Sequence, residues 1–251
     1  MKTTIRTSLI GKQEEFKMLE LGRALSLPVL LIGRPGVSKT AVVLEYFKSI
    51  QPDARPEDSF VLETDESTPN SAIKGFINIE KFFNSNTIET VAPITTASCI
   101  LINEIDKSSA MLRNSLLGVM NERMIYSGKE KVPCNWQLFV ATCNQIPKNE
   151  RQSPFFDRFI IKHEVHGINR IQMMQYFNEG CRNYKEEIHI NRADSASLSA
   201  IEVPTEKLKI FVDLFIERIS NRTLTYLPDM ARAICCIWGY SINQALIKCA
   251  Q

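Results

Sequence analysis

The chain has 251 residues, of which 44% are hydrophobic and 23% are charged, so it can bury a sizeable core as one large and one small domain. Its formal net charge is +2, and no long block of lysines and arginines occurs. Composition and charge therefore give no support to the binding of nucleic acid or of an anionic membrane surface.

The first predicted elements are a helix, a strand and a second helix. Apolar side chains placed between charged ones in residues 11–27 predict an amphipathic helix that ends at Pro28. The continuous apolar run Val29–Ile32 predicts a buried strand, and the apolar-rich residues 41–44 predict the next helix. The segment between them therefore joins the end of a strand to the start of a helix.

This joining segment has the composition of a phosphate-binding loop. Its residues are Gly33, Arg34, Pro35, Gly36, Val37, Ser38, Lys39 and Thr40, and Ala41 continues into the helix. Glycines let successive backbone N–H groups curl toward a phosphate, and the helix N-terminus favours anions. Lys39 suits the β- and γ-phosphates of ATP, and the Thr40 hydroxyl suits Mg2+. Ser38 replaces the usual third glycine and is small enough to be tolerated; an ordinary turn before a helix is the alternative interpretation.

A second buried strand, Cys99–Ile102, ends in the polar residues Asn103 and Glu104. Because open parallel sheets bind their ligands at the carboxyl ends of strands, Glu104 is the candidate to polarise an attacking water. Asn103 stands where a Mg2+-linked aspartate is usual, and its uncharged carbonyl should hold the water shell of Mg2+ more weakly. Asp106 would lie on the opposite face of an extended strand, unless the chain has already turned. The alternative is a polar exit from a strand with no further role.

The other predicted elements follow these motifs or lie between them. They are a strand at 60–62, a stretch without a clean period at 67–96, a helix at 110–120, a hairpin at 123–134, and strands at 138–142 and 159–161. Beyond residue 166 the strand signals stop, and apolar stripes at three- and four-residue spacing predict an all-helical region. We therefore predict an α/β fold with a five-stranded, mostly parallel sheet in residues 1–166 and a small helical domain in residues 167–251.

Taken in order, these motifs resemble a MoxR-type AAA+ ATPase over nearly the whole chain. The stretches that carry the resemblance are Leu9–Lys12, Gly33–Thr40, Asn103–Lys107, Asn121–Arg123, Val140–Asn144 and Phe156–Phe159. Each stretch is weakly specific alone, whereas their order and spacing together are specific. The resemblance implies an AAA+ αβα P-loop sandwich followed by a helical lid domain.

The family's roles can be transferred where the residues match. Lys39 and Thr40 would be the phosphate-loop pair, and Glu104 would be the catalytic carboxylate. Asn144 would be the sensor that hydrogen-bonds the γ-phosphate or the attacking water. Arg158 would be an arginine finger that reaches the nucleotide of a neighbouring subunit, where it neutralises charge in the transition state.

Two further assignments rest on the same resemblance. Ile10 and Gly11 resemble the segment at the edge of the adenine. Arg222 resembles the sensor arginine of the lid domain, which lies over the phosphates of its own subunit. Ordinary structural roles are the alternatives: a loop cap for Asn144, a surface ion pair for Arg158, and a surface arginine at a helix start for Arg222.

The resemblance also implies an assembly and partners. It implies a homo-oligomeric ring, expected to be hexameric, that works like a chaperone by remodelling or activating a partner protein. Proteins with a von Willebrand factor A domain are common companions of the family. A helix insertion within residues 71–91 and the hairpin within residues 122–136 would be typical surfaces for engaging a substrate or partner.

Nothing in the sequence pattern indicates export or a membrane partner. The N-terminus has no long apolar segment, and the apolar stretch at 233–250 is interrupted by Asn243, Gln244 and Lys248. The seven cysteines show no Cys-x-x-Cys pair, which is typical of buried thiols in a reducing compartment. We therefore expect a cytoplasmic protein.

Three functions remain open at this point. The leading one is a Mg2+-dependent ATPase that drives motions of the lid and ring. The second is an ATP-binding scaffold with little hydrolysis, because Asn103 lacks the charge of an aspartate. The third, a nucleic-acid motor, depends only on Lys129 and Lys131 at the predicted hairpin tip, and these lysines also suit a solvated turn.

Overall fold

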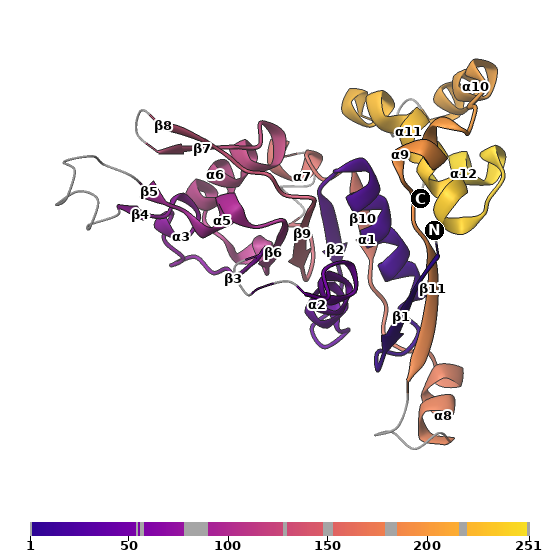
Figure 1. Cartoon of the computed structure of the whole chain (residues 1–251), viewed down its shortest axis with the longest axis horizontal. Helices are drawn as coiled ribbons and strands as arrows, with labels where there is room; N and C mark the ends of the chain where they lie inside the picture. Colours follow the sequence, from indigo (N-terminus) through magenta and orange to yellow (C-terminus); the bar gives the residue numbers. More distant parts are fainter. Residues whose placement is uncertain are drawn as a thin grey trace. The chain divides into compact units, whose positions relative to one another are not determined.

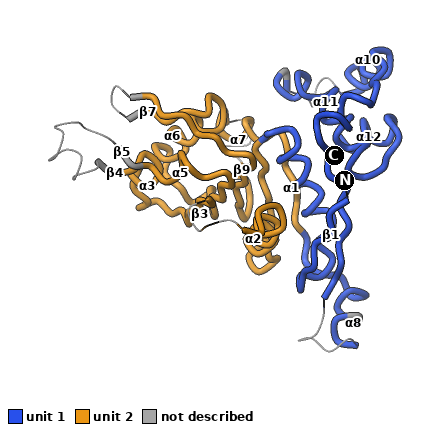
Figure 2. The backbone as a smooth tube through the Cα atoms, viewed as in Figure 1, with its two compact units in different colours: residues 1–27, 166–251 blue, residues 28–165 orange. Residues whose placement is uncertain are grey.

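The chain divides into two compact units, residues 28–165 and residues 1–27 together with 166–251 (Figure 2). The computed structural model describes residues 2–53, 55, 58–77, 90–127, 130–147, 153–178, 185–215 and 220–249. The division into domains 1–166 and 167–251 stays a prediction. The contacts within the described chain group the first 27 residues with the C-terminal part.

A five-stranded sheet organises the unit formed by residues 28–165 (Figure 1). Its strands are β2 (Val29–Ile32), β3 (Ser59–Glu63), β6 (Cys99–Asn103), β9 (Leu138–Cys143) and β10 (Ile161–Glu164). The order across the sheet is β10-β2-β9-β6-β3, and every neighbouring pair is parallel. The predicted five-stranded parallel sheet is therefore confirmed. Its last strand begins at Ile161, two residues later than predicted.

Short helices and two small ribbons complete this unit. The helices are α2 (Lys39–Ile50), α3 (Ser71–Lys74), α5 (Pro93–Thr96), the 3-10 helix η2 (Ile105–Lys107), α6 (Ala110–Asn121) and α7 (Pro154–Asp157). The antiparallel ribbons pair β4 (Phe76–Ile77) with β5 (Thr90–Val91) and β7 (Met124–Ser127) with β8 (Glu130–Pro133). The second ribbon is the predicted hairpin. Its tip residue Lys129 and most of the expected helix insertion, residues 78–89, lie outside the described residues.

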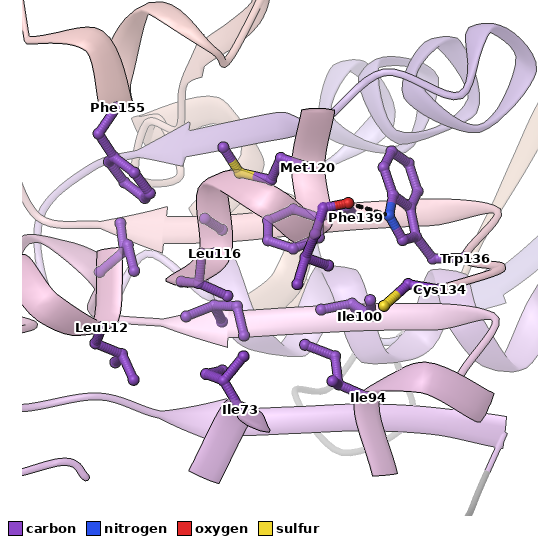
Figure 3. Packing of buried hydrophobic residues seen from close by; sticks show 14 of the residues in the cluster. Ile73, Ile94, Ile100, Leu112, Leu116, Met120, Cys134, Trp136, Phe139 and Phe155 are labelled. Carbon is purple, nitrogen blue, oxygen red and sulfur yellow. Dashed lines mark hydrogen bonds between the residues drawn. The ribbon is translucent and has the colours of Figure 1, made fainter. Parts of the chain in front are cut away.

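The main core of this unit lies between the sheet and α6. Ile100 of β6 and Phe139 of β9 pack in one cluster with Leu112 and Leu116, which stand four residues apart on α6 (Figure 3). Side chains alternate between the two faces of a strand, so the intervening buried residues of β6 and β9 face the other side, where α2 packs. Burial on both faces explains why these strands are continuous apolar runs.

The other unit combines the two ends of the chain. Its strands β1 (Lys2–Thr7) and β11 (Glu186–Asn191) pair antiparallel. Helix α1 (Gln13–Leu25) packs against α11 (Asn221–Trp238), and the indole Nε1 of Trp238 donates to Glu14 Oε2 at 3.0 Å. The remaining helices are α8 (Arg170–Asn178), α9 (Ser195–Ser199), α10 (Thr205–Phe215) and α12 (Ile242–Cys249).

The C-terminal region is mainly helical, as predicted, but the prediction that it is entirely helical is wrong, because this region contains β11. Ile188 and Ile190 are each 2% exposed and alternate with the exposed Glu187 and His189. This period of two is a strand signal. It is short, and the partner strand β1 lies at the opposite end of the sequence, so the pairing was hard to anticipate.

Two sequence expectations can be compared directly with the described residues. No described helix is both long enough and apolar enough to cross a membrane. Six cysteines of the described chain are free, and Cys99, Cys134 and Cys143 among them are buried, whereas Cys181 lies outside the described residues. The prediction of buried thiols therefore holds for these three.

Candidate nucleotide-binding site

The predicted phosphate loop connects β2 to α2 at the carboxyl end of the parallel sheet. A Cβ atom added to Gly33 would lie 2.5 Å from the backbone oxygen of Val165, so this position accepts only glycine without displacement of the chain. Gly36 has a φ of +83°, which also favours glycine. The backbone path of the loop therefore requires glycine at position 33 and favours it at position 36.

The ammonium group of Lys39 lies inside this loop. Its Nζ donates to the carbonyl oxygens of Gly33 (2.5 Å) and Arg34 (3.1 Å) and to Asn144 Oδ1 (3.2 Å). Partial burial is the main cause of a lowered pKa for Lys39, and negative charge at Cys143, Asp106 and Glu104 opposes it. The Cys143 thiol contributes little charge near neutral pH, because burial raises its pKa to about 12.

The hydroxyl of Thr40 connects the loop to β6. Thr40 Oγ1 donates to Asn103 Oδ1 at 3.0 Å, and Thr142 Oγ1 of β9 donates to the same oxygen at 3.1 Å. The amide of Asn103, a residue only 2% exposed, is thus oriented with its oxygen toward Thr40. Asparagine therefore keeps the acceptor function of an aspartate at this position and lacks only its charge.

Glu104 follows directly after β6 and has a left-handed backbone conformation, with φ 55° and ψ 40°. Its carboxylate oxygen Oε2 accepts a hydrogen bond from Lys107 Nζ at 2.6 Å, and this bond raises the pKa of Lys107. Lys107 uses one acceptor position of this carboxylate, and a carboxylate has further lone pairs that can accept from a water molecule. Sequence reasoning did not identify Lys107 or Thr142 as neighbours of the site.

Asn144 lies at the centre of these contacts. Its side-chain oxygen accepts from Lys39, and its backbone N–H donates to Asp106 Oδ2 at 3.3 Å. The structure thus brings together the predicted residues Lys39, Thr40, Asn103 and Asn144, and adds Asp106. The other oxygen of Asp106, Oδ1, is buried and has no hydrogen-bond partner among the described residues.

Arg158 lies apart from this group in the same unit. It follows α7, and its Nη1 donates to the Pro154 carbonyl oxygen at 3.1 Å. It lines a cavity of about 740 Å³ formed mainly by residues of α3, α6 and β7, and no residue of the phosphate loop is among the described residues that line this cavity. Arg158 therefore lies away from the phosphate loop of its own chain.

The remaining predicted residues belong to the other unit. Ile10 is buried there, and the backbone N–H of Gly11 donates to Glu186 Oε2 at 3.0 Å. Arg222 is half-buried in the first turn of α11. Contact of these three residues with a nucleotide stays a prediction.

The residues around the loop suit ATP and Mg2+. The first turn of α2 carries Lys39 and uncharged residues, so its N-terminal N–H groups can receive a phosphate. Mg2+ prefers oxygen ligands. Oxygen atoms near the loop are present on the side chains of Thr40, Asn103, Glu104 and Asp106. The described chain contains no cluster of three or more His, Cys, Asp or Glu side chains that could hold a metal alone. Mg2+ at nucleotide sites usually keeps several waters and is shared with substrate phosphates.

Replacing Ser38 by glycine is expected to stabilise the protein. Ser38 has a φ of 67°, a left-handed conformation that is strained for a residue with a Cβ atom. Relief of this strain should outweigh the greater freedom of glycine in the unfolded chain by about 0.5 to 1 kcal/mol. Thermal unfolding should then show a melting temperature about 1 to 4 °C higher.

Ser49→Gly is the matched control for this prediction. Ser49 lies in the last turn of the same helix, where the backbone is helical and glycine is unfavourable. Ser49→Gly should therefore lower the melting temperature. If Ser38→Gly lowers it as well, the left-handed conformation at Ser38 is not a source of strain.

The fold and the loop together define an AAA+ P-loop ATPase. The chain belongs to the MoxR family, because residues 1–203 match the family model described as "MoxR domain in the MoxR-vWA-beta-propeller ternary systems". A crystal structure named "putative ATPase" from Cytophaga hutchinsonii superposes with a TM-score of 0.69 at 17% sequence identity, over 97% of this chain and 81% of that one. This similarity supports the fold alone.

Two relatives share sequence similarity with this chain over part of their length. The structural protein ORF618 of Acidianus two-tailed virus is 27% identical over 165 residues, which are 64% of this chain and 26% of the viral protein. An uncharacterized protein of Methanocaldococcus jannaschii is 24% identical over 235 residues, which are 88% of this chain and 61% of that protein. The chain thus spans less than two thirds of the length of both relatives.

Proposed function

We propose that this chain binds and hydrolyses Mg-ATP at subunit interfaces of a homo-oligomeric ring and uses the energy to remodel or activate a partner protein. The observation that carries the proposal is the contact network at the carboxyl end of the sheet. Lys39, Thr40, Asn103 and Asn144 come from three separate segments, yet hydrogen bonds join them beside one helix N-terminus. Such convergence of a cation, a hydroxyl and polar acceptors is what binding of a triphosphate requires.

Each residue of the network has a separate role in this proposal. Lys39 exchanges its loop carbonyl partners for phosphate oxygens when the nucleotide enters. Thr40 donates its proton to Asn103, which leaves the lone pairs of its hydroxyl oxygen for the metal. Mg2+ held there would offset negative charge on the phosphates. Glu104 orients the attacking water through its carboxylate, and Asn144 hydrogen-bonds either that water or the γ-phosphate.

Arg158 completes the site from a neighbouring subunit in this proposal. Its cavity contains none of the loop residues among its described lining, which is compatible with action on another copy rather than on its own nucleotide. A guanidinium group placed beside the transferring phosphoryl group stabilises the transition state. The number of subunits is proposed to be six, as is usual in the family.

The proposed partner is a protein with a von Willebrand factor A domain. The description of the matching family model places its MoxR domain in MoxR-vWA-beta-propeller ternary systems, which supports this choice of partner. We propose that the chain works with such proteins in the cytoplasm, as a chaperone-like activator. Motions of the lid helices, including Arg222 at the start of α11, would transmit the state of the nucleotide to the partner.

An ATP-binding scaffold is the second candidate, because two observations favour it. Asn103 is uncharged, and the carboxylate of Glu104 is paired with Lys107. Both features would slow hydrolysis without preventing binding. Turnover that stays undetectable at every protein concentration, despite saturable binding, would support this candidate.

Lys39→Ala is expected to weaken binding of Mg-ATP by about 10- to 100-fold, the range for loss of a charged hydrogen-bond donor. Fluorescence anisotropy with a labelled ATP analogue measures the affinity. Phosphate release by the wild type tests hydrolysis in parallel and is followed over a range of protein concentrations. If sites form between subunits, turnover per subunit should rise steeply with protein concentration.

Lys48→Ala provides the control for charge, because Lys48 is an exposed lysine in the last turn of the same helix. Its affinity for the analogue should equal that of the wild type. Equal affinities for Lys39→Ala and the wild type would show that the nucleotide binds elsewhere or not at all.

A further inference from the structure

The proposed site contains less negative charge than a magnesium site usually does. β6 ends at Asn103, an amide, and the adjoining Glu104 carboxylate is paired with the ammonium of Lys107. A metal ion held beside phosphates benefits from a carboxylate that orders its water shell. A further carboxylate near the loop would provide this charge.

Asp106 is the carboxylate that the backbone turns toward the loop. In a continued strand its side chain would face away from Asn103. The strand instead ends at Asn103, Glu104 adopts a left-handed conformation, and Ile105–Lys107 form the 3-10 helix η2. This turn places Asp106 Oδ2 within 3.3 Å of the backbone nitrogen of Asn144.

Asp106 and the ammonium group of Lys39 consequently both contact the same residue, Asn144. Asn144 accepts from Lys39 through its side chain and donates to Asp106 through its backbone. The charge of Asp106 also acts on Lys39, where it counteracts the effect of burial on the pKa of that lysine. The two opposite charges therefore belong to the same local site.

One oxygen of Asp106 still has no partner. Oδ1 is buried and accepts no hydrogen bond from the described residues. A buried carboxylate oxygen without a partner is costly, and such an atom is commonly satisfied by a water molecule or an ion. A hydrated cation beside the loop would satisfy it.

We propose that Asp106 supplies the negative charge that Asn103 lacks and attracts hydrated Mg2+ to the phosphate loop. This inference rests on the proposed nucleotide site. Asp106 acts as a positioning residue, and Asn103 retains the separate task of accepting the hydrogen bond of Thr40. The charge and the acceptor that an aspartate would combine are thus divided between two residues.

The test first removes the charge of Asp106 and then restores a carboxylate at position 103. Asp106→Asn removes the charge and keeps an oxygen that can accept from the Asn144 N–H, so the nucleotide-free protein should melt near the wild-type temperature. A fluorescent non-hydrolysable ATP analogue is titrated with Mg2+ at fixed analogue concentration. The Mg2+ concentration at half-maximal binding should rise by about tenfold in Asp106→Asn, the size of one charge-assisted interaction.

The double variant Asn103→Asp/Asp106→Asn should return this midpoint to within about threefold of the wild type, because the charge is restored at the neighbouring position. Asp53→Asn, which removes an exposed carboxylate of the same unit, should leave the midpoint unchanged. An unchanged midpoint in Asp106→Asn would overturn the inference, and so would a raised midpoint that the double variant fails to lower.

The result also separates this inference from the proposed function. If the wild type shows no saturable binding of the analogue, both fail. If the wild type binds and Lys39→Ala does not, the nucleotide site stands, and the Mg2+ midpoints of the Asp106 variants alone decide the inference.

Discussion

Glu104→Gln is expected to reduce the turnover of ATP by about 10²- to 10⁴-fold, the usual contribution of a positioned general base. Glutamine has the same shape and can still contact Lys107, but its amide cannot take a proton from water. Binding of the labelled ATP analogue should therefore stay within a few-fold of the wild type. Phosphate release and anisotropy, measured on the same preparation, separate the two effects.

Glu63→Gln is the control for this substitution. Glu63 is exposed and stands opposite Asn103 at the end of the neighbouring strand, so the same chemical change occurs one strand away. Its turnover should match that of the wild type. A Glu104→Gln variant that keeps a third or more of wild-type turnover would remove Glu104 from the proposed mechanism.

Mixing variants extends the same measurement to the proposed ring. Arg158→Ala alone should lose about 10³-fold or more if Arg158 acts as an arginine finger. An equimolar mixture with Glu104→Gln should then recover measurable turnover, because some interfaces combine an intact Glu104 from one subunit with an intact Arg158 from another. A mixture as inactive as both separate variants would argue against action between subunits.

The sheet was predictable because its strands are buried on both faces. Such strands appear in the sequence as uninterrupted apolar runs, as in Val29–Ile32 and Cys99–Ile102, and no partner needs to be known to recognise them. β11 was missed for the opposite reason. It is stabilised by pairing with β1, more than 170 residues away in the chain, and a short alternation within a polar stretch is weak evidence without its partner.

The candidate site was predictable where the motif is contiguous and less so where the backbone turns. Lys39 and Thr40 follow from loop composition, and Asn144 follows from the resemblance to the MoxR family. Asp106 was expected on the opposite face only if the strand stayed extended past Asn103, and the sequence left open whether the chain turns there. The left-handed conformation of Glu104 changes that direction, and no residue type at this position signals it, since glutamate rarely adopts positive φ.

Trp136→Ala is expected to be the most destabilising single change in the core, at about 3 to 5 kcal/mol. Trp136 is 1% exposed, and its ring meets Phe139 edge-on at a centroid distance of 5.8 Å (Figure 3). The guanidinium of Arg123 lies 4.0 Å from the ring centroid. Alanine would leave a cavity and remove both contacts, and the melting temperature should fall by roughly 6 to 20 °C.

Trp136→Phe isolates the hydrogen bond of the indole. The Nε1–H donates to the carbonyl oxygen of Val119 at 2.9 Å, and Val119 lies in the last turn of α6, where carbonyl groups lack partners within the helix. Phenylalanine fills most of the space but leaves this buried oxygen unsatisfied, at a cost of about 1 to 3 kcal/mol. The expected order of melting temperatures is wild type, then Trp136→Phe, then Trp136→Ala.

Trp238→Phe is the comparison in the other unit. Its indole donates to Glu14, a half-exposed carboxylate that also accepts from Lys248, so the acceptor stays satisfied when the indole is removed. This variant should lose less stability than Trp136→Phe. If both phenylalanine variants lose the same amount, then ring size determines the cost, and the indole donor contributes nothing specific to the end of α6.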